Sequence, residues 1–467
     1  MHADAATVPG VLERAALAHH GAPALVDHRG TLTYRELLAA ARGTAAGLVR
    51  LGVGPGDRVA IRQPNGTAWA VASYGVLCAG ATVVPLDARY TDPEAADIVE
   101  RAGCALVIGP GDEFTGGDDA EVSRRMRAIT PERISHVQYT SGTEGRPKGV
   151  LLRHGALVAT TRTWVEITGL RASDRYPLVA PFSHIGGHKT GLLACAVAGA
   201  CGLPQPALDA PTLSRAVAGG AVTFLQGPPA MYQALLDHTT APGRVRAAVT
   251  GAASVPSALV RDLRSVLGVG TVITAYGLTE ASGVCTMTRP GDDARAVAET
   301  AGRPIPGVRV RIAAGSGEIL VSGAGLMAGY LDDAEATARV MGDGWLRTGD
   351  LGVLDAGGRL RVVGRLKDVI IVGGLNAYPA EIERVLLEHP AVRRAAVVGV
   401  GHEWLGEVPA AFVVGTRDES VGAFCRARLA GFKVPRLLWW VDDLPVNAAG
   451  KAARRALRAE AERRVRP

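Results

Sequence analysis

The sequence predicts an α/β protein built from layers of sheets and helices. Its 467 residues exceed the size of a usual single core, which indicates at least two domains. Hydrophobic residues make up 48% of the chain, enough to fill large buried cores. Helix-like and strand-like patterns alternate through residues 1–110 and again through 137–310. Such alternation is typical of a layered α/β fold.

The predicted elements of the first 120 residues are helices that stop at a glycine and short strands. In order, they are a helix at 39–51, a strand at 58–61, a helix at 68–79 and a strand at 81–85. Residues 109–119 are rich in glycine and acidic side chains, so we expect a mobile surface loop there.

Later segments continue the pattern and then change. We expect a helix at 254–267, a strand at 271–274, short strands with glycine turns in 308–364, strands at 369–372, 395–400 and 410–414, and a basic, Ala-rich helix in 451–466. The uncharged run between Lys189 and Asp209 contains too many glycines and prolines for a membrane helix, and it predicts a buried helix followed by a turn.

Composition excludes several classes of protein. The net charge is +6, from 51 basic and 45 acidic residues, which is mild for this length and argues against a nucleic-acid partner. The six cysteines are scattered and form no CxxC pair, as expected of reduced core residues in a cytoplasmic protein. The first ten residues lack the basic and apolar regions of a signal peptide.

A polar loop at 139–150, YTSGTEGRPKGV, carries the strongest functional signal. It offers hydroxyls, unhindered backbone N–H groups and one cation to a polyphosphate. It is not a Walker A loop, because Pro147 precedes Lys148 and Gly149 follows it. The candidate phosphate-binding residues are Thr140, Ser141, Gly142, Thr143, Gly145 and Lys148.

Four further motifs follow in a fixed order. They are TAYGLTE at 274–280, GWLRTGDLG at 344–352, GRLKDVIIVGGLNAYPAEIE at 364–383 and PVNAAGK ending at 451. Together with the phosphate loop they resemble the adenylate-forming superfamily of acyl-CoA synthetases, luciferases and nonribosomal adenylation domains. The finer pattern looks most like acyl-CoA ligases of steroid and alicyclic acid breakdown and their relatives in biosynthetic clusters.

The resemblance implies a fold and a division into domains. A large N-terminal adenylation domain, residues 1–364, would combine layered α/β sheets with a small β-barrel. Residues 365–368 would form a hinge, with Lys367 as its pivot, and residues 369–467 a small, mobile α+β lid. The active site would lie between the two domains, where ligand sites often occur.

The implied reaction is ATP- and Mg²⁺-dependent adenylation of a small organic acid, followed by transfer to CoA. Lys451 would lie between the substrate carboxylate and the α-phosphate, and Thr143 and Glu280 would bind Mg²⁺. Tyr276 would lie against adenine, Thr279 would contact the α-phosphate, and Asp350 and Arg365 would bind the ribose. The remaining positions that the resemblance assigns to ATP are Gly251, Ala252, Ala253, Thr274, Ala275 and Gly277. Glu144 departs from the usual pattern, where a threonine is common, and we expect it to face away from the triphosphate.

The segment at 180–193, APFSHIGGHKTGLL, resembles the family's acid-pocket gate. His184 would be the gate, and Gly187, His188 and Lys189 would line the pocket. Lys189 has two interpretations: it pairs with a second polar group of the substrate, or it is a surface lysine that reaches solvent. Gly373 and Gly374 would line the tunnel for the thiol arm of CoA.

Three alternatives stay open at this stage. A diazotase would activate nitrite with ATP and pass it to an aryl amine, and His184, His188 and Lys189 would suit a small anion. A carrier protein could replace CoA as acceptor, binding at the basic C-terminal surface. A non-catalytic nucleotide-binding module is disfavoured, because Lys451, Glu280, Asp350 and Arg365 are all present. We expect a monomer or homodimer.

Overall fold

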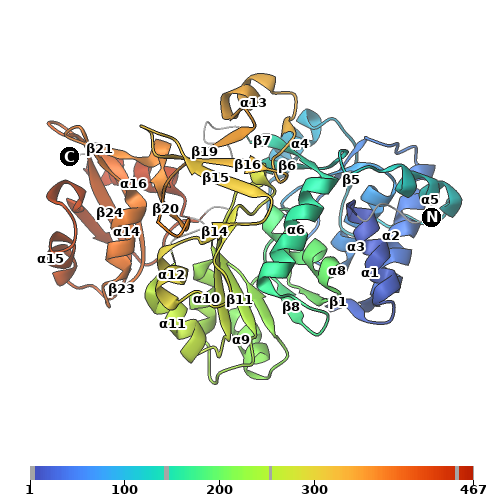
Figure 1. The fold of residues 1–467 in the computed structure, drawn as a ribbon, viewed down its shortest axis with the longest axis horizontal. Helices are drawn as coiled ribbons and strands as arrows, with labels where there is room; N and C mark the ends of the chain where they lie inside the picture. Colours follow the sequence, from blue (N-terminus) through green and yellow to red (C-terminus); the bar gives the residue numbers. More distant parts are fainter. Residues whose placement is uncertain (1–5, 141–146, 252–254, 447–451, 466–467) are drawn as a thin grey trace.

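The computed structural model describes residues 6–140, 147–251, 255–446 and 452–465. These residues fold into five β-sheets with helices packed on their faces (Figure 1). The two ends of the chain lie far apart along the long axis of the molecule. Residues after 368 form the unit at the C-terminal end, and the other four sheets make up the rest of the structure.

A six-stranded sheet positions the phosphate loop. In the order β17-β7-β6-β4-β3-β5 its strands are β17 (Gly329–Tyr330), β7 (Lys148–Arg153), β6 (Ile134–Thr140), β4 (Thr82–Pro85), β3 (Arg58–Ile61) and β5 (Cys104–Ile108). The last residue of β6, Thr140, pairs with the first residue of β7, Lys148. The hairpin therefore holds both ends of the loop in place. Ser141, Gly142, Thr143, Glu144 and Gly145 lie outside the described residues.

Helices surround this sheet, and some of them pack on its strands while others pack on neighbouring helices or on the four-stranded sheet. The helices of this region are α1 (Val8–Ala18), α2 (Tyr34–Arg50), α3 (Thr67–Cys78), α4 (Asp92–Arg101), α5 (Asp119–Ala128) and α6 (His154–Thr168). A capping box at Thr33 and Glu36 starts α2, five residues before the predicted start. Gly75 of α3 lies so close to Thr44 of α2 that a Cβ would be 2.5 Å from its methyl carbon. The two helices therefore pack at unusually close range.

A four-stranded sheet, β2-β1-β9-β8, carries the candidate acid-pocket segment between its last two strands in sequence. Its strands are β1 (Pro23–Asp27), β2 (Gly30–Thr33), β8 (Arg175–Leu178) and β9 (Cys201–Pro204). Between β8 and β9 lie α7 (Ile185–Gly187), the π-helix η1 (His188–Leu193) and α8 (Ala194–Ala198). The prediction of a helix and a turn after Lys189 holds up to residue 199, but it missed β9, because Gly202 and Pro204 obscure a strand pattern.

A five-stranded sheet, β10-β11-β12-β13-β14, carries the TAYGLTE motif. Its strands are β10 (Phe224–Gln226), β11 (Ala247–Gly251), β12 (Thr271–Tyr276), β13 (Thr286–Met287) and β14 (Arg303–Pro304). Its helices are α9 (Ala210–Ala218), α10 (Pro229–Leu236), α11 (Ser257–Ser265) and α12 (Ala294–Glu299). The strand predicted at 271–274 is two residues longer in the structure, and the helix predicted at 254–267 is shorter at both ends.

An antiparallel sheet follows where the resemblance implies a small β-barrel. Its strands are β15 (Val308–Ile312), β16 (Glu318–Gly323), β18 (Met341–Gly342), β19 (Trp345–Leu354) and β20 (Leu360–Arg365), and α13 (Ala334–Val340) lies beside it. The motif residues Asp350 and Arg365 lie on the paired strands β19 and β20. The short helix η3 (Leu366–Asp368) then leads to the last sheet.

The C-terminal unit has a core of its own. Its strands are β21 (Ile370–Val372), β22 (Leu375–Ala377), β23 (Val392–His402), β24 (Gly406–Gly415) and β25 (Leu437–Trp440), with helices α14 (Pro379–Leu387), α15 (Ser420–Arg426) and α16 (Arg454–Val465). Val397 and Val413 belong to one apolar cluster, whereas Val398 and Phe412 belong to another. Since neighbouring residues of a strand face opposite sides, both faces of this sheet are covered.

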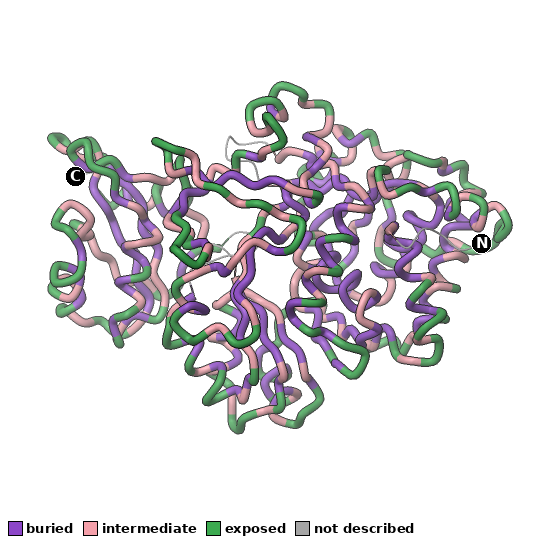
Figure 2. The backbone as a smooth tube through the Cα atoms, in the orientation of Figure 1, coloured by how far each residue is buried: buried purple, intermediate pink, exposed green. Residues whose placement is uncertain are grey.

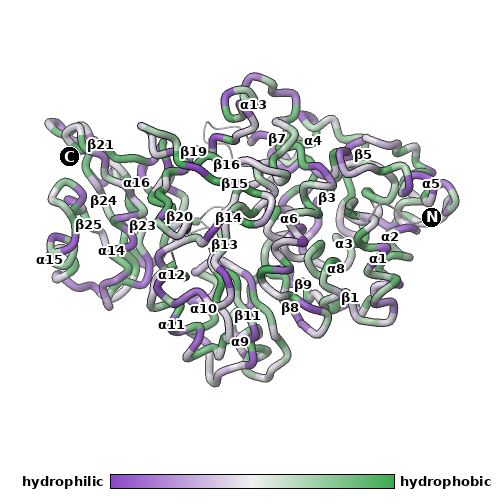
Figure 3. The backbone as a smooth tube through the Cα atoms, in the orientation of Figure 1, coloured by the Kyte–Doolittle hydropathy of each residue, from purple (hydrophilic) through white to green (hydrophobic). Residues whose placement is uncertain are grey.

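Burial follows the sheets throughout. Buried residues are concentrated in the strands, while exposed residues lie mostly in connecting loops and on outer helix surfaces (Figure 2), and hydropathy follows the same trend (Figure 3). All six cysteines are free thiols, as predicted, and five are buried. Residues 109–118 form the predicted surface loop, and α5 begins at Asp119. None of the described helices has both the length and the apolar character needed to cross a membrane.

Candidate active site

Asp350 is the centre of one polar cluster. It is 5% exposed on β19, and its Oδ2 accepts a hydrogen bond of 2.7 Å from the Tyr276 hydroxyl at the end of β12. Its Oδ1 lies 2.8 Å from Nε of Arg365, which is directly opposite in the β19–β20 ladder. Burial, and next the neighbouring Asp350 carboxylate, raise the pKa of Tyr276 well above its ordinary value. The phenol therefore stays protonated and continues to donate to Asp350.

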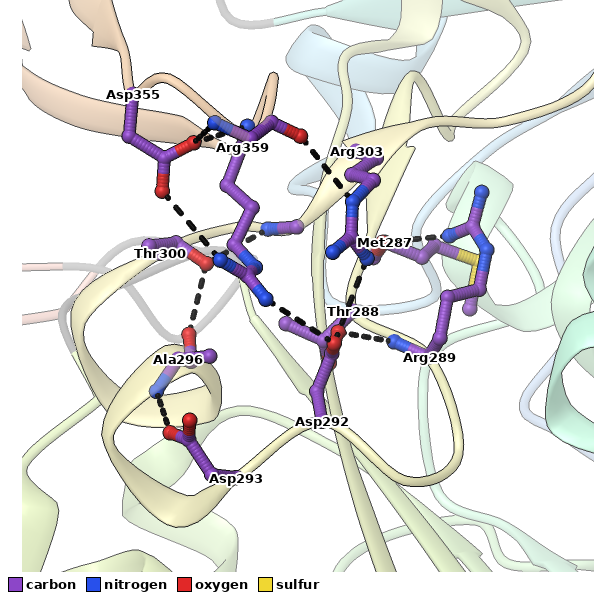
Figure 4. Close-up of polar contacts among 12 residues, drawn as sticks. Met287, Thr288, Arg289, Asp292, Asp293, Ala296, Thr300, Arg303, Asp355 and Arg359 are labelled. Atoms are coloured by element: carbon purple, nitrogen blue, oxygen red, sulfur yellow. Dashed lines mark hydrogen bonds and ion pairs between the residues drawn. The ribbon is translucent and has the colours of Figure 1, made fainter.

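A second polar network holds the β19–β20 hairpin against the rest of the fold (Figure 4). Asp292 lies 3.4 Å from the guanidinium of Arg303 and 3.6 Å from that of Arg359 on the hairpin. Asp292 also accepts a hydrogen bond of 2.7 Å from the backbone N–H of Arg289. Asp355, at the hairpin turn, accepts from the backbone N–H of Arg359 at 2.8 Å. The partly buried Asp292 carboxylate thus ties the strand pair that carries Asp350 to the loop after β13.

A third group joins the phosphate-loop strand to the TAYGLTE motif. Oε1 of Glu280, in the short helix η2 (Thr279–Ala281), accepts a hydrogen bond of 3.0 Å from the Tyr330 hydroxyl. Nζ of Lys148 lies 5.3 Å from the centre of the Tyr330 ring. Tyr330 therefore contacts both the loop lysine and the candidate magnesium ligand. Sequence reasoning missed this residue, since it follows an ordinary glycine-rich stretch, and its pairing with β7 is visible only in the fold.

The other predicted nucleotide residues lie around the end of β12. Gly251 ends β11 where a Cβ would lie 2.2 Å from the carbonyl oxygen of Ala275, so only glycine fits. Gly277 has the same restriction against the backbone of Gly283. Thr274 is directed into the fold, because its hydroxyl donates to the carbonyl of Val297 at 2.6 Å. Thr279 is 7% exposed. Ala252 and Ala253 lie outside the described residues.

The candidate acid-pocket segment combines one exposed and two buried basic side chains. His184 is exposed and caps α7 through its Nδ1, which accepts from the backbone N–H of Gly186 at 3.3 Å. Gly187 allows close contact, because a Cβ there would lie 2.0 Å from the carbonyl oxygen of Pro181. His188 is 5% exposed.

The partners of His188 place it in a buried network. Its Nε2 lies 3.2 Å from Oε1 of Gln138, and its ring stacks on that of His136 with centres 4.4 Å apart. Burial, and then the positive charges of His184 and Lys189, lower the pKa of His188 to about 3. His188 is therefore a neutral core histidine.

The burial of Lys189 contradicts its interpretation as a surface lysine. Its side chain is 0% exposed, and its Nζ has no hydrogen-bond partner among the described residues. Burial lowers the pKa of Lys189 to about 7, while the nearby Cys285 thiol acts weakly in the opposite direction. The lysine side chain does not reach solvent, and its pairing with a polar group of the substrate stays a prediction.

The hinge and tunnel candidates lie in short connecting structures. Lys367 is exposed in η3, immediately after Arg365 and Leu366. Gly373 and Gly374 form the turn between β21 and β22 and have φ values of +57° and +82°. A two-residue hairpin turn with positive φ at both positions favours glycine for local reasons. Lys451 lies outside the described residues.

The chemistry of these groups fits ATP and Mg²⁺. Each carboxylate oxygen of Asp350 can accept more than one hydrogen bond, so it can serve a vicinal diol while it keeps Tyr276 and Arg365. Thr250 Oγ1, beside Gly251, is buried without a partner in the described structure, as at a position completed by a ligand. The described residues contain no cluster of three or more metal-type side chains. Mg²⁺ at Glu280 would take its other ligands from phosphate and water, as this ion commonly does.

Comparisons with known proteins agree with this chemistry. The model of the AMP-binding enzyme family matches residues 12–331, and that of the AMP-binding enzyme C-terminal domain matches residues 381–451. The chain is 44% identical to a 3-[(3aS,4S,7aS)-7a-methyl-1,5-dioxo-octahydro-1H-inden-4-yl]propanoyl:CoA ligase of Mycobacterium tuberculosis, covering 97% of this chain and 99% of that one. It is 40% identical to the ligase of the same name from Rhodococcus jostii, covering 97% and 98%.

A solved structure shows the same fold with nucleotide bound. O-succinylbenzoate coenzyme A synthetase from Bacillus subtilis, in complex with ATP and magnesium ion, superposes with a TM-score of 0.83 at 28% identity and covers 96% of this chain and 98% of that one. The chain belongs to the AMP-binding enzyme family, within the adenylate-forming superfamily. Its activity is AMP-forming ligation of an acid to CoA, with ATP and Mg²⁺ as cofactors. The nitrite-activating alternative finds no support among these relatives.

Proposed function

We propose that the acid is an alicyclic carboxylic acid and that the residues around Asp350 and Glu280 carry its adenylation. The relatives that are 44% and 40% identical are named for a bicyclic, dioxo-substituted propanoyl group. The single observation that carries the assignment of roles is the turn from Tyr276 to Glu280. Tyr276, its first residue, is hydrogen-bonded to Asp350, and Glu280, its last, is hydrogen-bonded to Tyr330. One short segment therefore joins the two polar clusters.

In the first step, a carboxylate oxygen of the acid attacks the α-phosphorus of ATP. The new bond joins that oxygen to phosphorus, and the bond from phosphorus to the bridging oxygen of pyrophosphate breaks. Asp350 and Arg365 hold the ribose and Lys148 holds the outer phosphates, so that both reactants keep a fixed orientation. Mg²⁺, held by Glu280 and Thr143, would neutralise the charge of the leaving pyrophosphate.

Lys451 is our candidate for the cation between the two reacting anions. An ammonium there attracts both the carboxylate and the α-phosphate, and it reduces their repulsion in the transition state. In the second step, the thiolate of CoA attacks the acyl carbon, the thioester bond forms, and AMP leaves with the electron pair of the broken acyl–oxygen bond. Lys367 as hinge and Gly373 and Gly374 beside the thiol arm would serve this step.

Other acceptors find less support. The arginines of α16 are largely committed to neighbouring acids: Arg458 lies 2.6 Å from Glu407 and Arg464 lies 2.7 Å from Glu460. This helix therefore presents less free positive charge than its sequence implies, which disfavours it as a carrier-protein surface. The six free cysteines support a cytoplasmic location. We keep the expectation of a monomer or homodimer.

The test is pyrophosphate release from ATP and Mg²⁺ with a panel of aliphatic, alicyclic and aromatic acids, each with and without CoA. We expect turnover with alicyclic acids and formation of the CoA thioester by mass spectrometry. Lys451→Ala abolishes pyrophosphate release but still converts supplied acyl-adenylate to thioester. Arg455→Ala, four residues further on at an exposed position, is the matched control with normal turnover. Normal adenylation by Lys451→Ala would contradict the role of Lys451, and turnover restricted to aromatic acids would contradict the substrate class.

A further inference from the structure

Lys189 is a fully buried amine with an unused hydrogen-bonding capacity. Its side chain is 0% exposed in η1, and its Nζ is among the few buried polar atoms without a partner in the described structure. Leaving such a group unpaired costs stability, and a lysine is almost never found fully buried without a partner. The protein folds although the Lys189 amine is unpaired. A ligand that pairs with this amine is therefore expected to regain the lost free energy.

The surroundings of Lys189 place it beside the nucleotide site. The Cys285 thiol is near enough to act on the Lys189 charge, and the backbone N–H of Cys285 donates to the carbonyl of Tyr276 at 2.8 Å. Gly283, two residues before Cys285, packs on Ile185, since a Cβ there would lie 3.2 Å from its side chain. The segment that carries Lys189 therefore packs on the residues that directly follow Glu280 and η2.

The charges around Lys189 define what can bind it. His184 and His188 are close enough to be coupled to one another or to Lys189, and both are basic side chains. Three acids are coupled to this group of side chains. Asp87 acts on His184 and is paired with Arg89 at 2.8 Å, while Asp350 and Glu280 act on the Cys285 thiol, and none of the three is a hydrogen-bond partner of Lys189 Nζ. The described residues therefore supply Lys189 with no carboxylate. A ligand oxygen is the complementary group.

The reacting carboxylate cannot be that ligand group if the proposed function is right, because it must meet the α-phosphate near Lys451. We propose that Lys189 is a specificity-determining residue that binds a second oxygen acceptor of the acid substrate, a ketone or a second carboxylate, at a distance from the reacting carboxylate. The substrate class is thus an alicyclic acid with a distal acceptor. This inference rests on the proposed function and adds one recognition contact to it.

The experiment compares matched acids with the wild type and Lys189→Met. The three probes are 3-(4-oxocyclohexyl)propanoate, 3-(4-carboxycyclohexyl)propanoate and 3-cyclohexylpropanoate, which differ only at the ring position opposite the side chain. The readout is kcat/KM for pyrophosphate release. We expect the wild type to prefer one acceptor-bearing acid over 3-cyclohexylpropanoate by about 10–100-fold, because an unpaired polar group penalises the acid that lacks the acceptor.

Methionine keeps the length of the lysine side chain and removes its amine. In Lys189→Met we expect the preference to vanish or reverse, while turnover of 3-cyclohexylpropanoate stays equal or rises. Lys433→Met, at a part-exposed lysine paired with Glu381 in the C-terminal unit, is the matched control and keeps the wild-type ratio. A ketone preference identifies a neutral hydrogen-bond acceptor, and a preference for the second carboxylate identifies an ion pair.

The outcomes distinguish a failure of the proposed role of Lys189 from a failure of the proposed function. An unchanged ratio in Lys189→Met, or a wild type that prefers 3-cyclohexylpropanoate, overturns the role of Lys189 and leaves the ligase intact. Absence of pyrophosphate release with every acid, in a folded wild type, overturns the proposed substrate class and this inference with it. Thermal melting of both proteins without ligand confirms that the variant is folded.

Discussion

Asp350 and Arg365 are directly opposite each other on β19 and β20, with Arg365 Nε 2.8 Å from Asp350 Oδ1. Asp350 is almost fully buried, whereas the Arg365 side chain is 45% exposed. Arg365 is also the last residue of β20 and the first residue of the proposed hinge, 365–368. The ion pair therefore joins the candidate ribose carboxylate to the point where the C-terminal unit begins.

Asp350→Asn should raise the KM for ATP by about tenfold or more, because an amide cannot accept from two ribose hydroxyls while it keeps Tyr276 and Arg365. Pyrophosphate release against ATP concentration measures the effect. Arg361→Ala, an exposed position of β20, is the control and leaves the KM unchanged. An unaltered KM in Asp350→Asn would remove Asp350 from the nucleotide site.

Tyr330→Phe should raise the Mg²⁺ concentration needed for half-maximal turnover. The variant loses the hydrogen bond of 3.0 Å that orients Glu280, while the ring stays under the Lys148 ammonium. Loss of an orienting partner typically lowers metal affinity by about 10–100-fold. Glu280→Gln tests the ligand itself and should abolish turnover at any practical Mg²⁺ concentration. If Tyr330→Phe keeps the wild-type Mg²⁺ dependence, its hydrogen bond has no part in metal binding.

Asp292→Asn should lower the free energy of unfolding by about 1–3 kcal/mol, since Arg303 and Arg359 lose their shared charged partner. Urea unfolding measures this change. Asp293→Asn is a close control, because the neighbouring Asp293 only caps α12 and asparagine caps equally well. Equal stability of the two variants would show that the network of Figure 4 does not hold the hairpin.

Acid should destabilise the protein through its buried histidines. Burial lowers the pKa of His154 to about 3 and that of His188 to about 3, and it lowers the pKa of His136 well below its ordinary value of 6.5. Between about pH 6.5 and pH 3 these histidines bind protons in the unfolded chain but stay neutral in the folded protein. The free energy of unfolding therefore falls as the pH falls. Each histidine contributes up to about 1.4 kcal/mol per pH unit.

His154→Gln removes one of these titrating side chains. Between pH 6.5 and pH 3, the slope of the unfolding free energy against pH should decrease by up to about 1.4 kcal/mol per pH unit, the contribution of one bound proton. His20→Gln, at an exposed position, is the matched control. An unchanged slope in His154→Gln would mean that His154 is protonated in the folded protein.

Lys189→Met should stabilise the ligand-free protein. Burial lowers the pKa of Lys189 from 10.5 to about 7, so the ammonium costs folding free energy, fully below about pH 7 and not at all above about pH 10.5. A shift of this size corresponds to about 2–5 kcal/mol, and an apolar side chain of similar length removes that cost. Chemical denaturation at pH 6 measures the gain, and a loss of stability would show that the amine already has a partner.

Sequence alone determined the family, the order of the nucleotide motifs and many of the elements. The strand at 58–61 and the helix near 68–79 follow from patterns that are local in the chain, as do the motif residues Asp350, Arg365 and Glu280. Local patterns are readable because strand alternation, helix caps and glycine turns depend on neighbouring residues. The missed strand at 201–204 lacks such a pattern.

Tertiary structure alone decided which of these residues meet and which are buried. Tyr330 and Glu280 are 50 residues apart in sequence, and Tyr276 and Asp350 are 74 apart. Their hydrogen bonds depend on sheet order, which no local pattern encodes. The same holds for Lys189, whose sequence context allowed either a surface or a pocket position. Tertiary packing around η1 removes its amine from water, and that desolvation makes it a candidate recognition group.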